Sequence, residues 1–398
     1  MSKLEELIAR LCPDGVEYKE LKAFSKVLRG KRLTKNQLLK DGKYPVYHGG
    51  LEPLGYYNES NRNANTVMII NVGASAGTVG FCDIDFWSSD GCFCMEKSTC
   101  CIDKFLYYFL MTIENTIKSR VRHAGIPTLD AQVIDKIKVP VPPLEVQREI
   151  VHILDSFTSL TEELEKELAA RQKQYRFYRD ALLTFKNIDD IILNERTNEL
   201  ELSNVVRWMK LGDIGPVCMC KRILKSETNS QSGVPFYKIG TFGKEADAYI
   251  SHEKFSEYKA KYNFPKKGDV LISAAGTIGR TVIYDGKPAY FQDSNIVWID
   301  NDETQVTNAF LKYYYSMKPW KSSDGGTISR LYNDDIRKTP VPVPPLSEQQ
   351  RIVDILDRFD ALCNDITSGL PAEIEARKKQ YEYYRDKLLT FKELKKEA

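Results

Sequence analysis

The chain of 398 residues contains the same pair of segments twice. Residues 139–157, VPVPPLEVQREIVHILDSF, return at 341–359 as VPVPPLSEQQRIVDILDRF. Residues 171–186, RQKQYRFYRDALLTFK, return at 377–392 as RKKQYEYYRDKLLTFK. The copies lie 202 to 206 residues apart, so the repeating unit is half of the chain. Two copies of one sequence are expected to fold alike, which predicts an internal pseudo-twofold repeat.

The segments upstream of each copy match more weakly but keep their order. Matched positions include Lys31, Arg32 and Tyr47 with Lys221, Arg222 and Tyr237, and Gly77–Gly80 with Gly276–Gly279. Variable blocks therefore alternate with repeated blocks. The expected organisation is a folded domain at 1–143, a helix at 144–186, a linker at 187–204, a second domain at 205–345 and a second helix at 346–393.

The repeated blocks have the periodicity of long helices. After each Pro-Pro pair, apolar residues recur at steps of four and three, which forms a heptad seam. The seam positions are Ile150, Leu154, Phe157, Leu164 and Leu168 in the first block, and Ile352, Leu356, Phe359 and Ile366 in the second. Two such seams favour a coiled coil between the two helices. The alternative is an amphipathic helix packed on a globular core. Residues 368–371, SGLP, are expected to kink the second helix.

The variable blocks contain apolar, β-branched runs that end at glycine. TVMIINVG at 66–73 and DVLISAAG at 269–276 are typical strands. The fold class expected is therefore α+β, with two mixed α/β domains and two long helices. The glycine-rich run at 73–80 is interpreted as a tight strand connection, because a nucleotide-binding loop would open a helix. A backbone that contacts phosphate is the alternative.

Composition indicates a globular protein, with 42% hydrophobic and 28% charged residues. Apolar runs stay shorter than the roughly 20 residues of a membrane span, and the start does not resemble a secretory signal. A cytoplasmic protein without membrane contact is therefore expected. The nine cysteines form no C-x-x-C pair, so buried thiols such as Cys92 and Cys94 on one strand face are favoured over a metal site.

The overall net charge of +2 hides an uneven distribution. Residues 15–143 hold 17 Lys and Arg against 13 Asp and Glu, and residues 205–345 hold 20 against 15. Both variable blocks are therefore mildly basic, whereas the rest of the chain is acidic. This distribution permits the variable blocks to bind a polyanion.

Catalytic motifs for DNA chemistry are missing from the sequence. Adenine methylation uses Asn or Asp before Pro-Pro and an aromatic residue, whereas both pairs here stand in Val-Pro-Pro-Leu. A phosphate-binding loop needs Ser or Thr after Gly-Lys, which is also absent. Asp14, Glu17 and Lys19 imitate a nuclease motif, but their spacing suits a surface turn better than converging metal ligands.

Together these features resemble the specificity subunit of type I restriction–modification systems. The resemblance rests on Val-Pro-Pro-Leu with its following Gln, on the closing Tyr-Arg-Asp and Leu-Leu-Thr-Phe, and on the duplicated layout. It implies that 1–143 and 205–345 are target recognition domains, each reading half of a bipartite site in double-stranded DNA. It also implies that the helices form an antiparallel spacer.

The resemblance further implies partners and cofactors. Two modification subunits carrying S-adenosylmethionine would dock on the helices, and two restriction subunits would supply ATP- and Mg-dependent translocation and cleavage. No cofactor is expected in this chain. A helix from Leu144 to Phe185 would span roughly 60 Å at 1.5 Å per residue, close to two turns of DNA.

Basic and aromatic side chains near loop-forming glycines are the candidates for DNA contact. The first domain contributes Lys31, Arg32, Tyr47, His48, Arg120, Arg122 and His123. The second contributes Lys221, Arg222, Tyr237, Lys238, Lys318, Lys321 and Arg330. A solvated surface charge is the alternative for each Lys or Arg. For the whole chain, the rival functions are a self-contained restriction–methylation enzyme and a coiled-coil scaffold without DNA specificity.

The missing motifs generate a first prediction, which is that the purified chain neither methylates nor cleaves DNA by itself. Methylation should appear once a modification subunit is added, because that subunit supplies the methyl-transfer site. The measurement is incorporation of labelled methyl groups into DNA. Incorporation by the isolated chain would support the self-contained enzyme instead.

Overall fold

The computed structural model describes residues 3–185, 206–320 and 330–394. The predicted linker at 187–204 and the candidate Lys321 lie outside the described residues. Packing divides the chain into two compact units, Met1–Lys166 with Glu373–Ala398, and Glu167–Ala372. The domain boundaries taken from the sequence stay a prediction. They mark recognition domains and helices, whereas the two compact units are defined by how tightly residues pack together.

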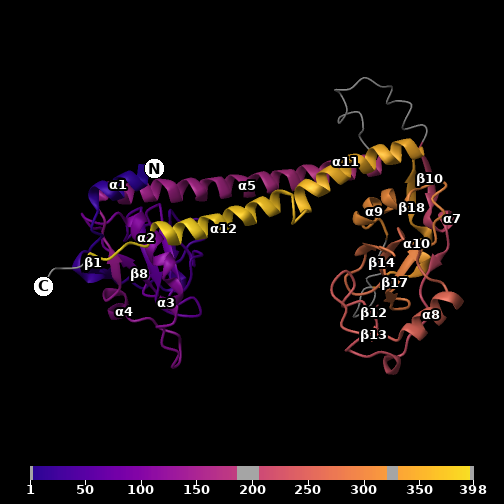
Figure 1. Cartoon of the computed structure of the whole chain (residues 1–398), viewed down its shortest axis with the longest axis horizontal. Helices are drawn as coiled ribbons and strands as arrows, with labels where there is room; N and C mark the ends of the chain where they lie inside the picture. The colour runs from indigo at the N-terminus through magenta and orange to yellow at the C-terminus, as the bar shows by residue number, and fades with distance from the viewer. Residues whose placement is uncertain (1–2, 186–205, 321–329, 395–398) are drawn as a thin grey trace, which may run out of the picture. The chain divides into compact units, whose positions relative to one another are not determined.

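The first unit combines short strands with a few helices (Figure 1). Its elements are α1 (Lys3–Leu11), β1 (Tyr18–Glu20), β2 (Val27–Leu28), β3 (Tyr44–Tyr47), β4 (Gly55–Tyr57), β5 (Thr66–Ile70), β6 (Val79–Cys82), β7 (Trp87–Ser88), β8 (Cys92–Met95), α2 (Asp103–Thr112), α3 (Glu114–Lys118), α4 (Ala131–Asp135), β9 (Lys138–Pro140), the first part of α5 (Leu144–Thr184) and most of α12 (Leu370–Leu388).

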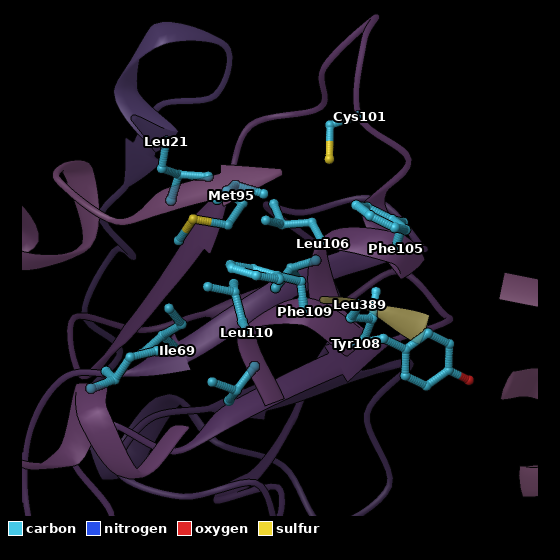
Figure 2. Close-up of a cluster of buried hydrophobic side chains, with 14 of the residues drawn as sticks. Leu21, Ile69, Met95, Cys101, Phe105, Leu106, Tyr108, Phe109, Leu110 and Leu389 are labelled. Atoms are coloured by element: carbon cyan, nitrogen blue, oxygen red, sulfur yellow. The ribbon is translucent and has the colours of Figure 1, made fainter. Parts of the chain in front are cut away.

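A four-stranded sheet in the order β2-β8-β5-β6 carries the main core of this unit. All residues of β5 are buried, as expected for a short apolar run covered on both faces. Helix α2 packs on this sheet, and Figure 2 shows its Phe109 and Leu110 close to Ile69 and Met95. The glycine-rich run connects β5 to β6 as an antiparallel pair, which confirms the predicted strand connection.

The second unit has its own strands and helices (Figure 1). These are the rest of α5, β10 (Arg207–Lys210), α7 (Leu211–Ile214), β11 (Val217–Cys218), β12 (Val234–Tyr237), β13 (Tyr249–Ile250), α8 (His252–Lys261), β14 (Val270–Ser273), β15 (Thr281–Ile283), β16 (Tyr290–Phe291), β17 (Ile296–Ile299), α9 (Asn308–Ser316), α10 (Asn333–Lys338), β18 (Pro340–Val343) and α11 (Leu346–Asn364).

The two units share one topology. The sheet β2-β8-β5-β6 corresponds to β11-β17-β14-β15, and β4-β3-β7 corresponds to β13-β12-β16. In both three-stranded sheets the middle strand is parallel to the last one, β3 to β7 and β12 to β16. The correspondence therefore includes strand direction as well as strand order. The fold is therefore α+β, with two mixed α/β units related by an internal repeat.

Each unit contains an antiparallel pair of helix segments. In the first unit, Phe157 of α5 stacks on Tyr384 of α12 at 5.5 Å, and Glu165 pairs with Lys378 at 2.7 Å. In the second unit, Tyr178 of α5 stacks on Phe359 of α11 at 5.7 Å. Arg171, which precedes Tyr178 in α5, lies close to Cys363 of α11. Burial raises the pKa of the Cys363 thiol, and the positive charge of Arg171 opposes that rise. In both pairs the partner residue number falls as the α5 number rises, so the helices run in opposite directions.

The second repeated block holds two helices rather than one. Helix α11 ends at Asn364, and α12 begins at Leu370. Between them, the Asp365 carboxylate accepts hydrogen bonds from the Thr367 N–H at 2.7 Å and from the Thr367 hydroxyl at 2.6 Å. A Cβ at Gly369 would lie 2.5 Å from the Ala361 carbonyl oxygen, so the chain can pass here only as glycine.

Ile366 is a wrong assignment to the helical seam. Its side chain is 81% exposed, because it lies in this break and not on a helix. The heptad pattern was extended across the break between α11 and α12, where the chain is not helical and the period no longer applies. Of the other seam positions, Ile150, Leu154, Ile352 and Leu356 are buried, and Phe157, Leu164, Leu168 and Phe359 are half-buried.

A fully buried glutamine joins the sheet region of the first unit to α5. The Gln147 side chain is 0% exposed and accepts a hydrogen bond from the Ile102 N–H at 2.8 Å. Its amide nitrogen donates to the carbonyls of Cys100 at 2.8 Å and Pro142 at 2.7 Å. Gln147 thus satisfies backbone groups of the loop before α2 and of the Pro-Pro turn. About two turns farther along the helix, the Tyr108 hydroxyl donates to Asp155 of α5 at 2.5 Å.

The second unit repeats this anchor. Gln349 is also 0% exposed, accepts from the Thr307 N–H at 2.8 Å, and donates to the carbonyls of Gln305 at 2.8 Å and Pro344 at 2.9 Å. The Tyr313 hydroxyl likewise donates to Asp357. The motif Val-Pro-Pro-Leu with its following Gln is therefore the sequence of a structural joint between a sheet region and a helix.

Two further expectations concern cysteines and membranes. Cys92 and Cys94 lie in β8 and are fully buried, which confirms the predicted strand position and burial. Within the described ranges, no group of three or more His, Cys, Asp or Glu side chains is placed to hold a metal ion. None of the helices in that part of the chain is both long and apolar enough to cross a bilayer.

We predict that Gln147→Leu lowers the free energy of unfolding of the first unit by about 2 kcal/mol or more, since it leaves buried backbone groups without partners. Gln349→Leu should do the same in the second unit. Gln350→Leu is the matched control, because Gln350 is exposed and, within the described part of the chain, its side chain donates to the exposed carboxylate of Asp354 on the same helix. The measurement is thermal unfolding of the full chain. Equal melting temperatures for Gln147→Leu and Gln350→Leu would contradict the structural role.

Candidate nucleic-acid interface

Lys31 and Arg32 are exposed on the segment that follows β2. The Lys31 carbonyl accepts a hydrogen bond from the indole N–H of Trp87 at 2.7 Å, and its N–H donates to the Ser88 carbonyl at 2.9 Å. The backbone is thus fixed on β7, while both cationic side chains extend into solvent. Exposed, well-positioned cations suit contacts with phosphate.

Lys221 and Arg222 are held in the same way in the second unit. The Lys221 carbonyl accepts from the Tyr290 hydroxyl at 2.9 Å, and Tyr290 lies in β16, the counterpart of β7. The Lys221 ammonium also lies 5.2 Å from the centre of the Tyr262 ring. Both units therefore present a Lys-Arg pair from an anchored loop.

The first unit has a groove of about 510 Å³ next to this loop. We call it the first-unit groove. It is lined by Arg32, Leu33, Thr34, Lys35, His48, Leu54, Asn71, Val72, Asp90, Gly91 and Thr128. The sequence candidates Arg32 and His48 are thus brought together, although they come from different strand connections. The groove combines two cationic side chains, Arg32 and Lys35, with the Asp90 carboxylate and with neutral hydrogen-bonding groups.

The imidazole of His48 is fixed at one of its nitrogens. Nδ1 accepts a hydrogen bond from the Gly91 N–H at 3.1 Å and lies 3.3 Å from an Asp90 carboxylate oxygen. Because an accepting nitrogen carries no proton, the neutral ring has its N–H at Nε2. A Cβ at position 91 would lie 2.6 Å from Nδ1, so glycine is needed for this contact.

A hairpin from Arg122 to Thr128 borders the groove. The two residues exchange backbone hydrogen bonds of 2.9 and 3.0 Å, and Thr128 itself lines the groove. The hairpin is fixed to the end of β5, because the Leu129 N–H donates to the Asn71 carbonyl at 2.9 Å. The Arg122 guanidinium pairs with Asp130 at 2.9 Å, and His123 is exposed nearby in the hairpin.

Two first-unit candidates lie elsewhere. Arg120 lines a separate cleft of about 380 Å³ with Ile113 and Ile117. Tyr47 packs edge-on against Phe86 at 5.6 Å, and burial raises its pKa to about 12. Tyr47 is therefore half-buried against the small core beside β3, and its contact with DNA stays a prediction.

The second-unit candidates are dispersed. Tyr237 stacks on Phe291 at 5.8 Å in an aromatic cleft of about 340 Å³, and Lys238 pairs with Asp247 at 2.8 Å. Lys318 is exposed with a left-handed backbone, φ 54°. Arg330 is half-buried, and its guanidinium donates to the Ser294 carbonyl at 3.4 Å.

The two units keep one backbone frame at the end of the central strand but change its side chains. Asn71 and Thr128 of the first unit correspond to Ala274 and Arg330 of the second. Thr128 pairs with Val72 in an isolated β-bridge, as Arg330 does with Ala275. The residue that follows in each unit donates its N–H to a carbonyl just after the central strand at 2.9 Å, from Leu129 to Asn71 and from Leu331 to Ala274. The frame is constant, whereas the groups that it presents differ.

Sequence reasoning missed Lys35, Asn71 and Thr128 in the first-unit groove. Lys35 could have been found, because it continues the basic run of Lys31 and Arg32. Asn71 gave a weaker signal as a polar residue at the end of an apolar strand. Thr128 gave none, because only the tertiary fold brings the hairpin to β5.

Known proteins support the same interpretation of the repeat. The family model described as Type I restriction modification DNA specificity domain matches residues 13–171 and again residues 206–376. The chain belongs to this family. Each match covers one variable block and part of a repeated helix, so these specificity domains follow the internal repeat.

Two relatives match nearly the whole chain. A Haemophilus influenzae chain named as a type I restriction enzyme specificity subunit is 45% identical, covering 94% of this chain and 96% of the relative. The EcoR124I/EcoR124II specificity subunit of Escherichia coli is 30% identical, covering 98% of this chain and 97% of the relative.

Solved structures agree on the fold. The crystal structure of a type I restriction-modification S subunit from M. genitalium aligns with a TM-score of 0.59 at 17% identity, covering 94% of this chain and 96% of that one. A chain from a study of complex assembly and conformational transition of the type I system gives a TM-score of 0.59 at 19% identity, covering 95% and 98%.

Proposed function

We propose that this specificity subunit recognises double-stranded DNA, with one half of a bipartite site read by each unit, and that it has no catalytic site of its own. The observation that carries the proposal is a backbone arrangement at the end of the central strand that both units share and from which they present different side chains. Asn71 and Thr128 in one unit, and Ala274 and Arg330 in the other, occupy equivalent places. A duplicated backbone frame that presents different side chains suits two readers of different base sequences.

The charges support the same proposal. The anchored pairs Lys31-Arg32 and Lys221-Arg222 expose two cations on each unit. Phosphate contacts of this kind position a protein on DNA, and groups in a groove then distinguish the bases. The first-unit groove contains both kinds of group.

In this proposal, DNA methylation and cleavage are carried out by partner subunits. We propose that two modification subunits hold S-adenosylmethionine and that two restriction subunits use ATP and Mg. The sequence supports this division, because the methyl-transfer motif and the phosphate-binding loop are missing from it. The relatives are themselves named as specificity subunits of type I enzymes.

The helices are proposed to set the distance between the half-sites and to dock the modification subunits. Helix α5 is one uninterrupted element of 41 residues that begins in the first unit and ends in the second. In each unit it pairs with an antiparallel partner through aromatic stacking. Helical backbones are stiff over this length, so such an element can act as a spacer.

We predict that replacing residues 15–143 with the equivalent block of the Escherichia coli relative changes one half of the recognised site. The other half should stay the same, because the second unit has its own sheets and core. The measurement is mapping of methylated adenines in cells that also carry the modification subunit. The reciprocal exchange of 205–345 is the control and should change only the opposite half. A simultaneous change of both halves would contradict two separate readers.

We also predict the effect of lengthening the helices. Seven residues inserted after Glu163 in α5 and after Lys379 in α12 keep the heptad register and add about 10 Å. The preferred spacer should grow by roughly three base pairs, with lower activity because the second half-site also rotates by about 100°. The measurement is the methylated consensus.

Insertion in α5 alone is the control for this experiment. It should move Glu165 of α5 about 10 Å away from Lys378 of α12, which breaks their ion pair and the helix contacts beyond it, and should lower the melting temperature. If the double insertion leaves both spacer and activity unchanged, the helices do not set the distance, and only their docking role remains.

A further inference from the structure

Asn71 is a buried polar residue that the packing of the first unit does not explain. It follows β5, is only 9% exposed, and lines the first-unit groove. Its side-chain oxygen Oδ1 has no hydrogen-bond partner among the described residues. Buried side-chain oxygens are usually paired, so an unpaired one needs a reason such as a missing ligand.

The backbone at this position is already satisfied. The Asn71 N–H donates to the Gly91 carbonyl at 3.1 Å, and its own carbonyl accepts from Leu129 at 2.9 Å. In the second unit the equivalent residue is Ala274, whose N–H donates to the Asn295 carbonyl at 2.7 Å and whose carbonyl accepts from Leu331 at 2.9 Å. Ala274 is 0% exposed, so the frame folds without any polar side chain here.

The surroundings of Asn71 fit a segment of duplex DNA. Arg32 and Lys35 line the same groove and outnumber its one carboxylate, Asp90, and the exposed Lys31 precedes them. His48 and Thr128 add polar groups from two other connections. Cations at a groove that also contains an unpaired amide provide phosphate and base contacts in one place.

We propose that Asn71 reads an adenine in the half-site of the first unit. This inference rests on the proposed function, since it names the base-reading residue of one recognition unit. A carboxamide offers one acceptor and donors side by side. In the major groove, adenine alone presents the complementary pair, the N6 amino donor beside the N7 acceptor. Guanine and thymine present only acceptors there, and cytosine only a donor.

The test uses the full chain assembled with its modification subunit and a pool of duplexes with randomised half-sites. The wild-type complex should select a bipartite consensus. With Asn71→Ala, we expect preference for adenine to disappear at one position of one half. Binding to the wild-type consensus should weaken by about 5- to 150-fold, the range for loss of a bidentate base contact. The other half should be selected as before.

Two further variants make the result specific. Asn71→Asp keeps the shape but has only acceptors when ionised, so preference at the same position should move from adenine towards cytosine. Asn115→Ala removes an exposed asparagine of α3 that does not line the groove, and should change nothing. Melting temperatures check folding, and Ala274 indicates that alanine fits this frame.

Several outcomes would overturn the inference. An unchanged consensus and affinity with Asn71→Ala would show that the residue does not read a base. An equal loss of affinity for all duplexes would assign Asn71 to positioning. If Asn71→Ala fails to fold, Asn71→Asp decides, and unchanged adenine preference in that variant rejects the proposal. A wild-type complex that selects no bipartite consensus would instead reject the proposed function itself.

Discussion

The buried amide of Gln147 is the contact through which the first unit connects recognition elements to a helix. It bonds the backbone at Cys100 and Ile102, just before α2, and at Pro142, just before α5. Proline provides no N–H, and the Pro-Pro turn starts the helix without a conventional capping side chain. One side chain therefore fixes where α5 leaves the sheet region. Gln349 repeats these bonds in the second unit, so both joints have the same geometry.

This joint allows the recognition surface to vary without changing the scaffold. The Tyr108 to Asp155 and Tyr313 to Asp357 hydrogen bonds add a second fixed point about two helical turns beyond each glutamine. Groups at the far end of the central strand, such as Asn71 and its counterpart Ala274, belong to neither joint. Their replacement changes the hydrogen-bonding groups at the groove while leaving the backbone bonds in place. A protein that must recognise different sequences with one architecture benefits from this separation.

Much of the fold could be predicted because it depends on local patterns. The buried strand β5 was visible as an apolar run that ends at glycine, and the seam through Ile150 and Leu154 was visible as a heptad period. The same reasoning failed at Ile366, since periodicity cannot detect where Asp365 and Gly369 close a break. It also could not tell how far Tyr47 is buried, because a tyrosine in a strand gives no indication of which face is covered.

The sequence by itself determined the duplication, the alternation of sheet regions with helices, and the family, because these depend on order along the chain. It also identified Arg32 and His48, whose residue types suit DNA contact. Only the tertiary structure decided that these two residues share a groove with Asn71 and Thr128, since five separate connections converge there. It also showed that Asn71 Oδ1 lacks a partner among the described residues. Burial and hydrogen bonding are properties of neighbours in space, which spacing along a single chain does not encode.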